Sequence, residues 1–318
     1  MLYAYRAIKG RLERLAPEAA LDGALWIDLY LPSAAQVDAV RALGVDVPTL
    51  ADMEEIEISN RLYRENGLDY MTVVLPGHTP DKRHIASPIC FILSAERLVT
   101  VRHHAPRPFE TYPDRADKVG PGCATPREVF LGVVEEIIGR QADLLEGSGR
   151  ALDEVSATIF ASDNAKLLPQ VLQTALERVG REGNLQGMVR LALLTLERAL
   201  GFFSPTLTTN GDGLRAVVKG LLRDIQALEV HADFLSNRVA LASDATLGMI
   251  NLAQNSTVRI VSVVAVLFLP PTLIASIYGM NFKYMPELAQ SWGYGAALGL
   301  MVLSAALTYL FFKWKHWL

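Results

Sequence analysis

Apolar residues form two long uninterrupted runs near the end of the chain, and shorter alternating patterns precede them. No charged residue occurs from Ile260 to Phe282, and none occurs from Leu288 to Phe312. Each run exceeds the ~18 apolar residues that mark a membrane-spanning helix. Two buried helices of a soluble core are the alternative, but such helices rarely run so far without a charge. The pattern predicts transmembrane helices at 258–280 and 292–312, joined by an external loop at 281–291.

The first third of the chain has the pattern of a mixed α/β domain, which we place at 1–123. The apolar stretch from Ala24 to Pro32 predicts a buried strand. An Asn66-Gly67 turn separates two strand-like runs, and a second hairpin is expected to turn at Ser94–Glu96. Between these strands, a serine cap and a terminal glycine predict a short helix from Ser33 to Gly44.

From Pro126 onward the apolar residues recur at helical spacing, and we expect a helical region at 124–213. A glycine-rich break at Gly201–Gly213 ends it. No proline then occurs between Leu214 and Pro270, and the helical pattern continues into the first apolar run. One helix of about 60 residues would be on the order of 90 Å long. We expect residues 214–257 to be its cytoplasmic part, a stalk.

Charges that flank the apolar runs predict their orientation. Arg259 precedes the first run, and Lys313 and Lys315 follow the second, whereas the loop balances Lys283 against Glu287. Positive charges are retained preferentially on the cytoplasmic side, and the first residues lack the apolar stretch of a signal peptide. We therefore expect both termini, including the basic segment 313–318, in the cytoplasm and the protein in the inner or plasma membrane, in contact with lipid.

Other features of the composition argue against several function classes. The formal net charge is −4 and no basic run occurs, so nothing indicates nucleic-acid binding. Cys90 and Cys123 lack metal-ligand spacing and are expected to be free thiols. No catalytic constellation and no phosphate-binding loop stands out, so the chain is not expected to be an enzyme.

One stripe along the first predicted span contains mostly small or polar residues, at alternating steps of three and four. Its members are Asn255, Val258, Ser262, Ala265, Leu269, Thr272, Ser276 and Gly279. Close helix packing through small side chains is one interpretation. Lining of a water-filled pore is the other, favoured by Asn255 at one end and Asn281 beyond the other, because polar groups are costly against hydrocarbon. Two spans cannot enclose a lumen, so a pore requires several subunits.

Pro270 and Pro271 interrupt this predicted helix in mid-membrane. Neither has an amide hydrogen, so carbonyls near Val266 and Leu267 lose their usual partners. A kink satisfied by neighbouring helices is one interpretation, and a gating hinge is the other. Leu269, on the stripe, is a candidate for a hydrophobic constriction that stops ions by dewetting.

The segment Phe268–Leu288, with Leu247–Asn255 before it and FFKWKHWL at the end of the chain, resembles the CorA family of magnesium transport proteins. Tyr278, Gly279, Met280 and Asn281 match that family's signature, and MPEL matches the loop that follows it. The similarity extends less sharply upstream through Asp52–Tyr63.

The resemblance implies an α+β membrane protein that assembles as a funnel-shaped homopentamer. Each subunit would have a cytoplasmic α/β domain, a long stalk helix continuing into the pore-lining span, and an outer second span. It implies passive influx of Mg²⁺, with Co²⁺ and Ni²⁺ also carried.

The resemblance also assigns roles along the pore. Asn281 would form a ring at the outer mouth that holds hydrated Mg²⁺, with Gly279 allowing carbonyls to approach the ion. Asn255 would form an inner polar ring, and Leu269 with Val261 or Val258 the apolar narrowing. A neutral oxygen ring suits Mg²⁺, which gives up its waters reluctantly. Glu287 would concentrate cations outside or be an ordinary solvated charge.

The family is also thought to sense cytoplasmic Mg²⁺ through acidic residues between subunits. Asp81 and Asp224 lie near the matching places, although the partner position itself is Gly220 or Arg223 here. Asp244 matches the family more closely, and an ion pair with a basic neighbour such as Arg238 is its alternative role. A solvated surface carboxylate is the competing interpretation for Asp81 and Asp224.

Two rival functions remain. One is a zinc transporter of the related ZntB type, in which the loop after the asparagine tends to be glycine-rich and less acidic, so FKYMPEL favours the magnesium branch. The other is a membrane-anchored oligomeric scaffold or sensor without ion flux, which uniformly lipophilic spans would have suited better than Asn281 and the polar stripe.

Overall fold

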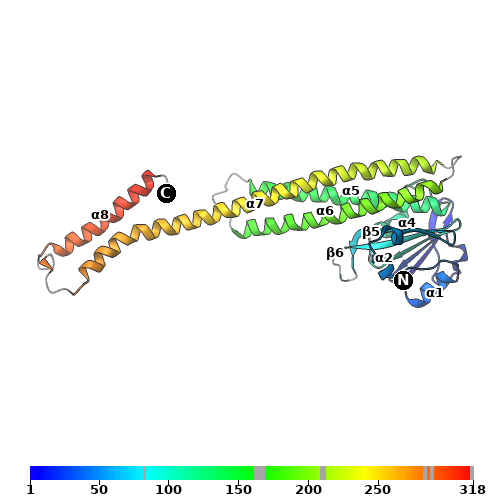
Figure 1. The fold of residues 1–318 in the computed structure, drawn as a ribbon, viewed down its shortest axis with the longest axis horizontal. Coiled ribbons are helices and arrows are strands. Elements are labelled where there is room, and N and C mark those ends of the chain that lie inside the picture. The colour runs from blue at the N-terminus through cyan, green and yellow to red at the C-terminus, as the bar shows by residue number, and fades with distance from the viewer. Residues whose placement is uncertain are drawn as a thin grey trace. The chain divides into compact units, whose positions relative to one another are not determined.

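The computed structural model describes residues 1–79, 81, 84–160, 169–207, 213–281, 285–286 and 290–315 (Figure 1). The chain forms two compact units. The first contains Met1–Thr158 and Glu177–Ser243, and the second contains Ile159–Leu176 and Asp244–Leu318. Glu287 and Lys283, both considered from the sequence, lie outside the described residues.

A seven-stranded sheet forms the base of the first unit, in the order β2-β1-β3-β7-β6-β5-β4. Its strands are β1 Leu2–Ile8, β2 Arg11–Arg14, β3 Trp26–Tyr30, β4 Leu62–Glu65, β5 Leu68–His78, β6 His84–Leu93 and β7 Leu98–Arg102. β3 and β7 pair in parallel, and the other neighbours are antiparallel. The predicted strand at Ala24–Pro32 is confirmed as β3, whereas β1 and β2 were not predicted.

Local turn chemistry explains the connections between the strands. Asn66 and Gly67 have φ angles of 49° and 80°, so both take the left-handed conformation that a type I′ hairpin turn requires. At the β6–β7 turn, the Ser94 hydroxyl oxygen accepts hydrogen bonds from the backbone N–H groups of Glu96 and Arg97, at 3.2 and 2.9 Å. Both predicted hairpins are confirmed.

Short helices connect or cover the strands: η1 Leu21–Gly23, α1 Ala34–Arg41, α2 Leu50–Glu54, α3 Ile58–Arg61 and α4 Pro108–Arg115. The predicted helix after Ser33 is confirmed as α1. Ser33 and Gln36 form a capping box, in which each side chain bonds to the other residue's backbone.

Three long helices follow, α5 Pro126–Ile159, α6 Pro169–Phe203 and α7 Leu214–Tyr278, with a 3-10 turn η3 at Ser204–Thr206. Within the first unit, α5 and α6 pack against the sheet. The ring centroids of Phe91 and Phe130 lie 5.4 Å apart, and those of Phe130 and Phe203 lie 5.0 Å apart. The backbone N–H of Val74 in β5 donates to the hydroxyl of Thr195 in α6, at 3.0 Å.

Buried and half-buried polar side chains connect the three helices in the first unit. The Gln186 amide donates to the Ser148 hydroxyl at 3.1 Å, and the Ser236 hydroxyl donates to the Gln186 carbonyl oxygen at 3.4 Å. Ser148 lies in α5, Gln186 in α6 and Ser236 in α7. Unpaired polar groups are costly in a core, so this chain of hydrogen bonds favours one longitudinal register of the three helices.

Replacing either of two glycines in α5 by alanine should change the stability of the protein, in opposite directions for the two positions. A Cβ on Gly132 would lie 2.3 Å from the Tyr112 hydroxyl oxygen, whereas one on Gly139 would meet nothing within 4 Å. We expect Gly132→Ala to destabilise the protein by about 1–3 kcal/mol through overpacking. Gly139→Ala should stabilise the helix by up to about 1 kcal/mol. Thermal unfolding of the full-length protein in detergent would reveal melting temperatures shifted in opposite directions, and a shift of the same sign would contradict this explanation.

The second unit contains the later part of α7 and the last helix, α8 Gly293–Trp314. α7 stays helical through Pro270 and Pro271, and its end at Tyr278 agrees with the long helix predicted from the sequence. Each of these two helices contains an apolar window of which 6% is buried. Core helices of a soluble protein would be mostly buried, so the two helices are consistent with a two-span membrane protein.

Candidate functional site

The predicted stripe on α7 is uncovered along its whole length. Asn255, Ser262, Ala265, Thr272, Ser276 and Gly279 are exposed. The apolar candidates are exposed as well, with 64% of Val258, 63% of Val261 and 63% of Leu269 accessible. A shallow cavity of about 430 Å³ follows the middle of the stripe and is lined by Ala265, Phe268, Leu269, Thr272, Leu273 and Ser276.

The opposite face of α7 is less exposed. Val263 is buried, and Leu267, Pro270, Ile274 and Tyr278 are half-buried. Helix residues two positions apart point about 200° apart, so the less exposed face lies nearly opposite the stripe.

α8 also has a less exposed face and doubles back after α7 (Figure 1). Phe312 is buried there, and Met301, Ser304 and Thr308 are half-buried. Each of the two helices therefore has one side that is less exposed than the others, and on α7 the stripe is not part of that side.

Two hydroxyl groups of the stripe are bonded within their own helix. Ser262 donates to the Val258 carbonyl oxygen at 2.8 Å, and Thr272 donates to the Phe268 carbonyl oxygen at 2.7 Å. Such bonds satisfy the hydroxyl proton without a partner helix, and they leave the oxygen's acceptor capacity. This detail was missed from the sequence, although serine or threonine inside an apolar helix is its usual signal. These hydrogen bonds are compatible both with close helix packing and with the lining of a pore.

The signature residues lie at the C-terminal end of α7. Gly279 N–H donates to the Ala275 carbonyl oxygen at 2.9 Å, and Met280 N–H donates to that of Ile277 at 3.2 Å. A Cβ on Gly279 would lie 3.1 Å from the Ala275 oxygen, so glycine suits this close approach of the chain. Asn281 follows and is exposed. Because the carbonyl end of a helix carries partial negative charge, this end attracts cations without a carboxylate.

The three regulatory candidates are isolated carboxylates in the described part of the chain. Asp81, Asp224 and Asp244 are exposed, and none forms an ion pair with another described residue. Among the residues described, no three His, Cys, Asp or Glu side chains gather as a metal site. The suggested pairing of Asp244 with Arg238 is wrong, because Arg238 contacts Asp153 of α5 at 2.5 Å instead. Which carboxylate pairs with Arg238 depends on the packing of α5 on α7, which the local sequence cannot reveal.

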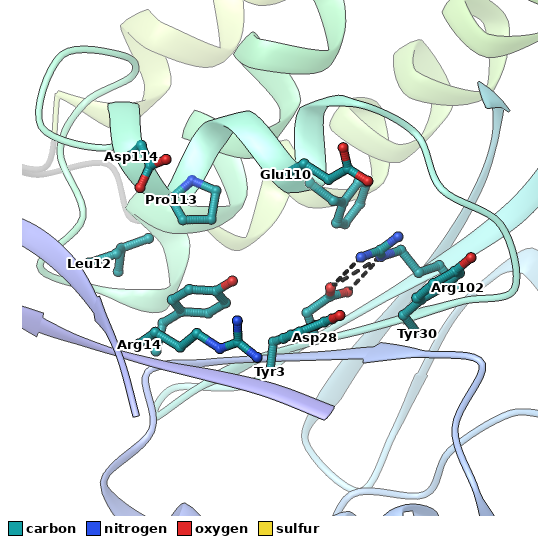
Figure 2. Close-up of a pocket in the computed structure, with 11 residues that line it drawn as sticks. Tyr3, Leu12, Arg14, Asp28, Tyr30, Arg102, Glu110, Pro113 and Asp114 are labelled. Carbon is teal, nitrogen blue, oxygen red and sulfur yellow. Dashed lines mark hydrogen bonds and ion pairs between the residues drawn. The ribbon is translucent and has the colours of Figure 1, made fainter. Parts of the chain in front are cut away.

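A separate pocket of about 370 Å³ lies in the first unit, between α4 and the strands β1, β2, β3 and β7 (Figure 2). Its floor contains a buried ion pair in which Arg102 Nη2 and Asp28 Oδ2 are 2.9 Å apart. Arg102 Nε is 3.1 Å from each oxygen of Asp28, and Thr100 donates a hydroxyl bond to Asp28 at 2.8 Å. The pair joins β3 to β7, and nothing local in the sequence had indicated it.

His104 lies buried, two residues after the end of β7. Its Nε2–H donates to the Leu75 carbonyl oxygen at 2.8 Å, and Nδ1 has no hydrogen-bond partner among the described residues. Burial, with the nearby Arg102 charge contributing, lowers the pKa of His104 to about 4. The ring is therefore neutral in the folded protein and has a structural role.

The depressed pKa of His104 predicts a pH dependence of stability. Between pH 6.5 and about 4 the unfolded chain binds a proton that the folded chain does not. The contribution of neutral His104 to the free energy of unfolding is therefore fully present above pH 6.5. Up to roughly 3 kcal/mol of that free energy is lost as the pH falls toward 4. We expect His104→Gln to flatten this part of the profile, measured as melting temperature against pH. An unchanged slope would assign the acid sensitivity to other groups.

The family model described as CorA-like Mg²⁺ transporter protein matches residues 22–314. The chain belongs to the CorA family. Proteins named magnesium transport protein CorA from Pasteurella multocida and Escherichia coli are each 34% identical to it, over 322 and 325 residues, with 100% of both chains covered. The corresponding protein of Salmonella typhimurium is 35% identical over 325 residues.

Solved structures support the same assignment at the level of the fold. The complete structure of the CorA magnesium transporter from Methanocaldococcus jannaschii aligns with a TM-score of 0.73 and 17% identity, covering 100% of this chain and 99% of that chain. The ZntB cytoplasmic domain from Vibrio parahaemolyticus aligns with a TM-score of 0.56 and 11% identity, covering 77% and 96%. The CorA arrangement of an N-terminal α/β domain, a long helix and two apolar helices is confirmed.

Proposed function

We propose that the chain carries Mg²⁺ passively across a membrane, driven by the membrane potential. The observation that supports this proposal is the exposed stripe of α7, which leads to Asn281 and lies opposite the less exposed side of the helix. Relatives that match over the full length are named magnesium transport proteins, which supports Mg²⁺ as the transported ion. No phosphate-binding loop is needed, because a divalent cation gains about 4.6 kcal/mol per 100 mV inward, twice the ~2.3 kcal/mol per elementary charge.

The uncovered stripe requires several copies of the chain around one axis. We propose a funnel-shaped homopentamer in which the stripe faces the lumen and α8 faces lipid. In this assembly Asn255 forms an inner polar ring, and Thr272 and Ser276 turn acceptor oxygens toward the passing ion. Leu269, with Val258 or Val261, forms the apolar narrowing that dewets when the pore is closed.

Selection takes place at the outer mouth, in this proposal. Mg²⁺ keeps its inner waters, so Asn281 side-chain oxygens accept hydrogen bonds from water already bound to the ion. The carbonyl ends of the α7 helices add negative potential at the same place. Tyr278, Gly279 and Met280 hold the asparagine there, and Glu287 raises the cation concentration outside.

The proposal also covers the orientation of the chain in the membrane and the sensing of cytoplasmic Mg²⁺. We place both termini in the cytoplasm, since Arg259, Lys313 and Lys315 flank the spans on one side. Asp81, Asp224 and Asp244 are the candidates for sensing cytoplasmic Mg²⁺, and Co²⁺ and Ni²⁺ are alternative substrates.

The deciding experiment is uptake into liposomes that contain the purified full-length protein and a Mg²⁺-sensitive dye. An inward-negative potassium diffusion potential should drive Mg²⁺ entry, and collapsing the potential should stop it. Co²⁺ and Ni²⁺ should compete. Uptake of Zn²⁺ alone would assign the chain to the zinc branch of the superfamily, and no flux of any divalent ion would leave a membrane-anchored scaffold or sensor.

A further inference from the structure

The pocket between α4 and the sheet contains charges that its lining residues do not balance among themselves. We call it the α4 pocket. Its volume of about 370 Å³ (Figure 2) lies at the small end of the range of about 300–1,000 Å³ that is typical of ligand sites. The charged residues that line it are Arg14, Asp28, Arg102, Glu110 and Asp114. Asp28 and Arg102 neutralise each other on the floor, so one guanidinium group and two carboxylates are left.

Strand register brings the sheet side of the α4 pocket together. Tyr5 of β1 lies directly opposite Arg14 of β2, and Tyr3 of β1 lies opposite Asp28 of β3. Opposite residues of paired strands point to the same face of a sheet, and so do residues two positions apart on one strand. Leu12 therefore shares this face with Arg14. Side chains from three strands meet α4 here and line one cavity (Figure 2).

Arg14 is held in place with its hydrogen-bond donors available. Its Cζ atom lies 4.3 Å from the ring centroid of Tyr3, a contact that uses the flat face of the guanidinium group. The N–H donors point outward in the plane of that group. Arg14 is exposed and forms no ion pair with any other described residue. It can therefore bind a carboxylate through two parallel hydrogen bonds.

Glu110 and Asp114 supply two negative charges at the edge of the α4 pocket. They are four positions apart on α4, so their Cβ atoms are about 5–6 Å apart, a spacing at which like charges repel each other. Both are exposed, and neither forms an ion pair within the described part of the chain. A ligand with two positive groups would relieve this repulsion. Leu12 and Pro113 line the same cavity and offer apolar contacts to a short carbon chain.

We propose that the α4 pocket binds a free basic amino acid, such as lysine or arginine. The carboxylate of the ligand pairs with Arg14, and its two cationic groups pair with Glu110 and Asp114. One negative and two positive groups complement the charges that are left in the pocket. A diamine would leave Arg14 facing like charge, and a dicarboxylic acid would face two carboxylates. All of these residues belong to the first unit, and binding does not depend on ion flux.

The test is isothermal titration calorimetry of the full-length protein in detergent at neutral pH. Lysine or arginine should bind with one site per chain and a dissociation constant below about 1 mM. Cadaverine, which lacks the carboxylate, and glutarate, which lacks the amines, should bind at least about tenfold more weakly. The absence of saturable binding by both amino acids would overturn the proposal. Equal binding of cadaverine would also overturn it, because Arg14 would then contribute nothing.

Variants of the lining residues locate the site. Arg14→Gln and Glu110→Gln should each weaken the binding of lysine at least about tenfold, with melting temperatures close to that of the wild type because both side chains are exposed. Arg6→Gln is the matched control. Arg6 is also exposed and follows Tyr5 on β1, so it points to the opposite face of the sheet, and its replacement should leave binding unchanged.

Two results with these variants would contradict the α4 pocket as the binding site. One is unchanged binding in Arg14→Gln, and the other is equal weakening in Arg14→Gln and Arg6→Gln, which would indicate a general effect of net charge. Because the readout is heat of binding, neither result bears on the proposed transport. Absence of ion flux in liposomes would likewise leave this inference standing.

Discussion

Replacing Asn281 with alanine is expected to reduce potential-driven Mg²⁺ uptake by about ten- to a hundredfold while the protein still folds and inserts. The substitution removes the amide oxygen that follows the exposed end of α7, and with it the proposed acceptor for the ion's bound water. Hydrogen bonds to charged groups contribute about 1.5–3 kcal/mol, and each ~1.4 kcal/mol corresponds to a factor of ten. The measurement is the initial rate of dye response in liposomes at a fixed diffusion potential.

The matched control is Gln290→Ala, which removes an exposed amide of the same loop without touching the signature. Its uptake should equal that of the wild type. Equal loss in both variants would point to a general effect on the loop, and unchanged flux in Asn281→Ala would exclude the asparagine ring as the selective mouth.

Removing one partner of the buried ion pair should cause the largest loss of stability. Asp28 and Arg102 are 2% and 3% exposed, so Arg102→Ala would leave the carboxylate of Asp28 desolvated, with Thr100 as its remaining side-chain partner among the described residues. Breaking a buried pair in this way typically costs about 3–5 kcal/mol. For a domain of this size we expect the melting temperature of the full-length protein in detergent to fall by about 10 °C.

Two further variants distinguish the effect of an unpaired buried charge on stability from the effect of shortening an arginine side chain. Arg150→Ala breaks the exposed pair with Glu146 on α5 and should change stability by less than about 0.5 kcal/mol. Joint replacement by Asp28→Leu and Arg102→Met removes both charges and should recover much of the loss. If the double variant is no more stable than Arg102→Ala, packing rather than the unpaired carboxylate accounts for the effect.

Signals of short range predicted much of the fold. Asn66-Gly67 gave the β4–β5 hairpin because asparagine and glycine both tolerate positive φ. The β1–β2 hairpin uses the same kind of turn at Lys9 and Gly10, with φ of 50° and 77°. Lysine is not a marker of that conformation, so this hairpin had no comparable signal.

Contacts between residues that are far apart in the chain could not be predicted from the sequence. The Asp28–Arg102 pair depends on the parallel register of β3 and β7, which aligns Asp28 with Thr100 and Tyr30 with Arg102. The contact of Arg238 with Asp153 depends on how α5 and α7 pack. Within α7, by contrast, helical periodicity alone located the stripe, and the structure adds that its residues are exposed while the other side of the helix is less so. The roles of the stripe and of Asn281 stay predictions.

The spacing of the stripe also constrains how copies of α7 can cross. Seven residues of an ideal α-helix turn about 20° less than two full turns, so residues seven apart are not quite in line. From Asn255 to Gly279 this mismatch accumulates to roughly 70°, so in a bundle of straight, parallel helices the stripe would rotate away from a common axis. Winding the helices gently around one another in a left-handed sense removes the mismatch. A change in that winding would therefore alter which side chains meet at the axis without breaking a single helix.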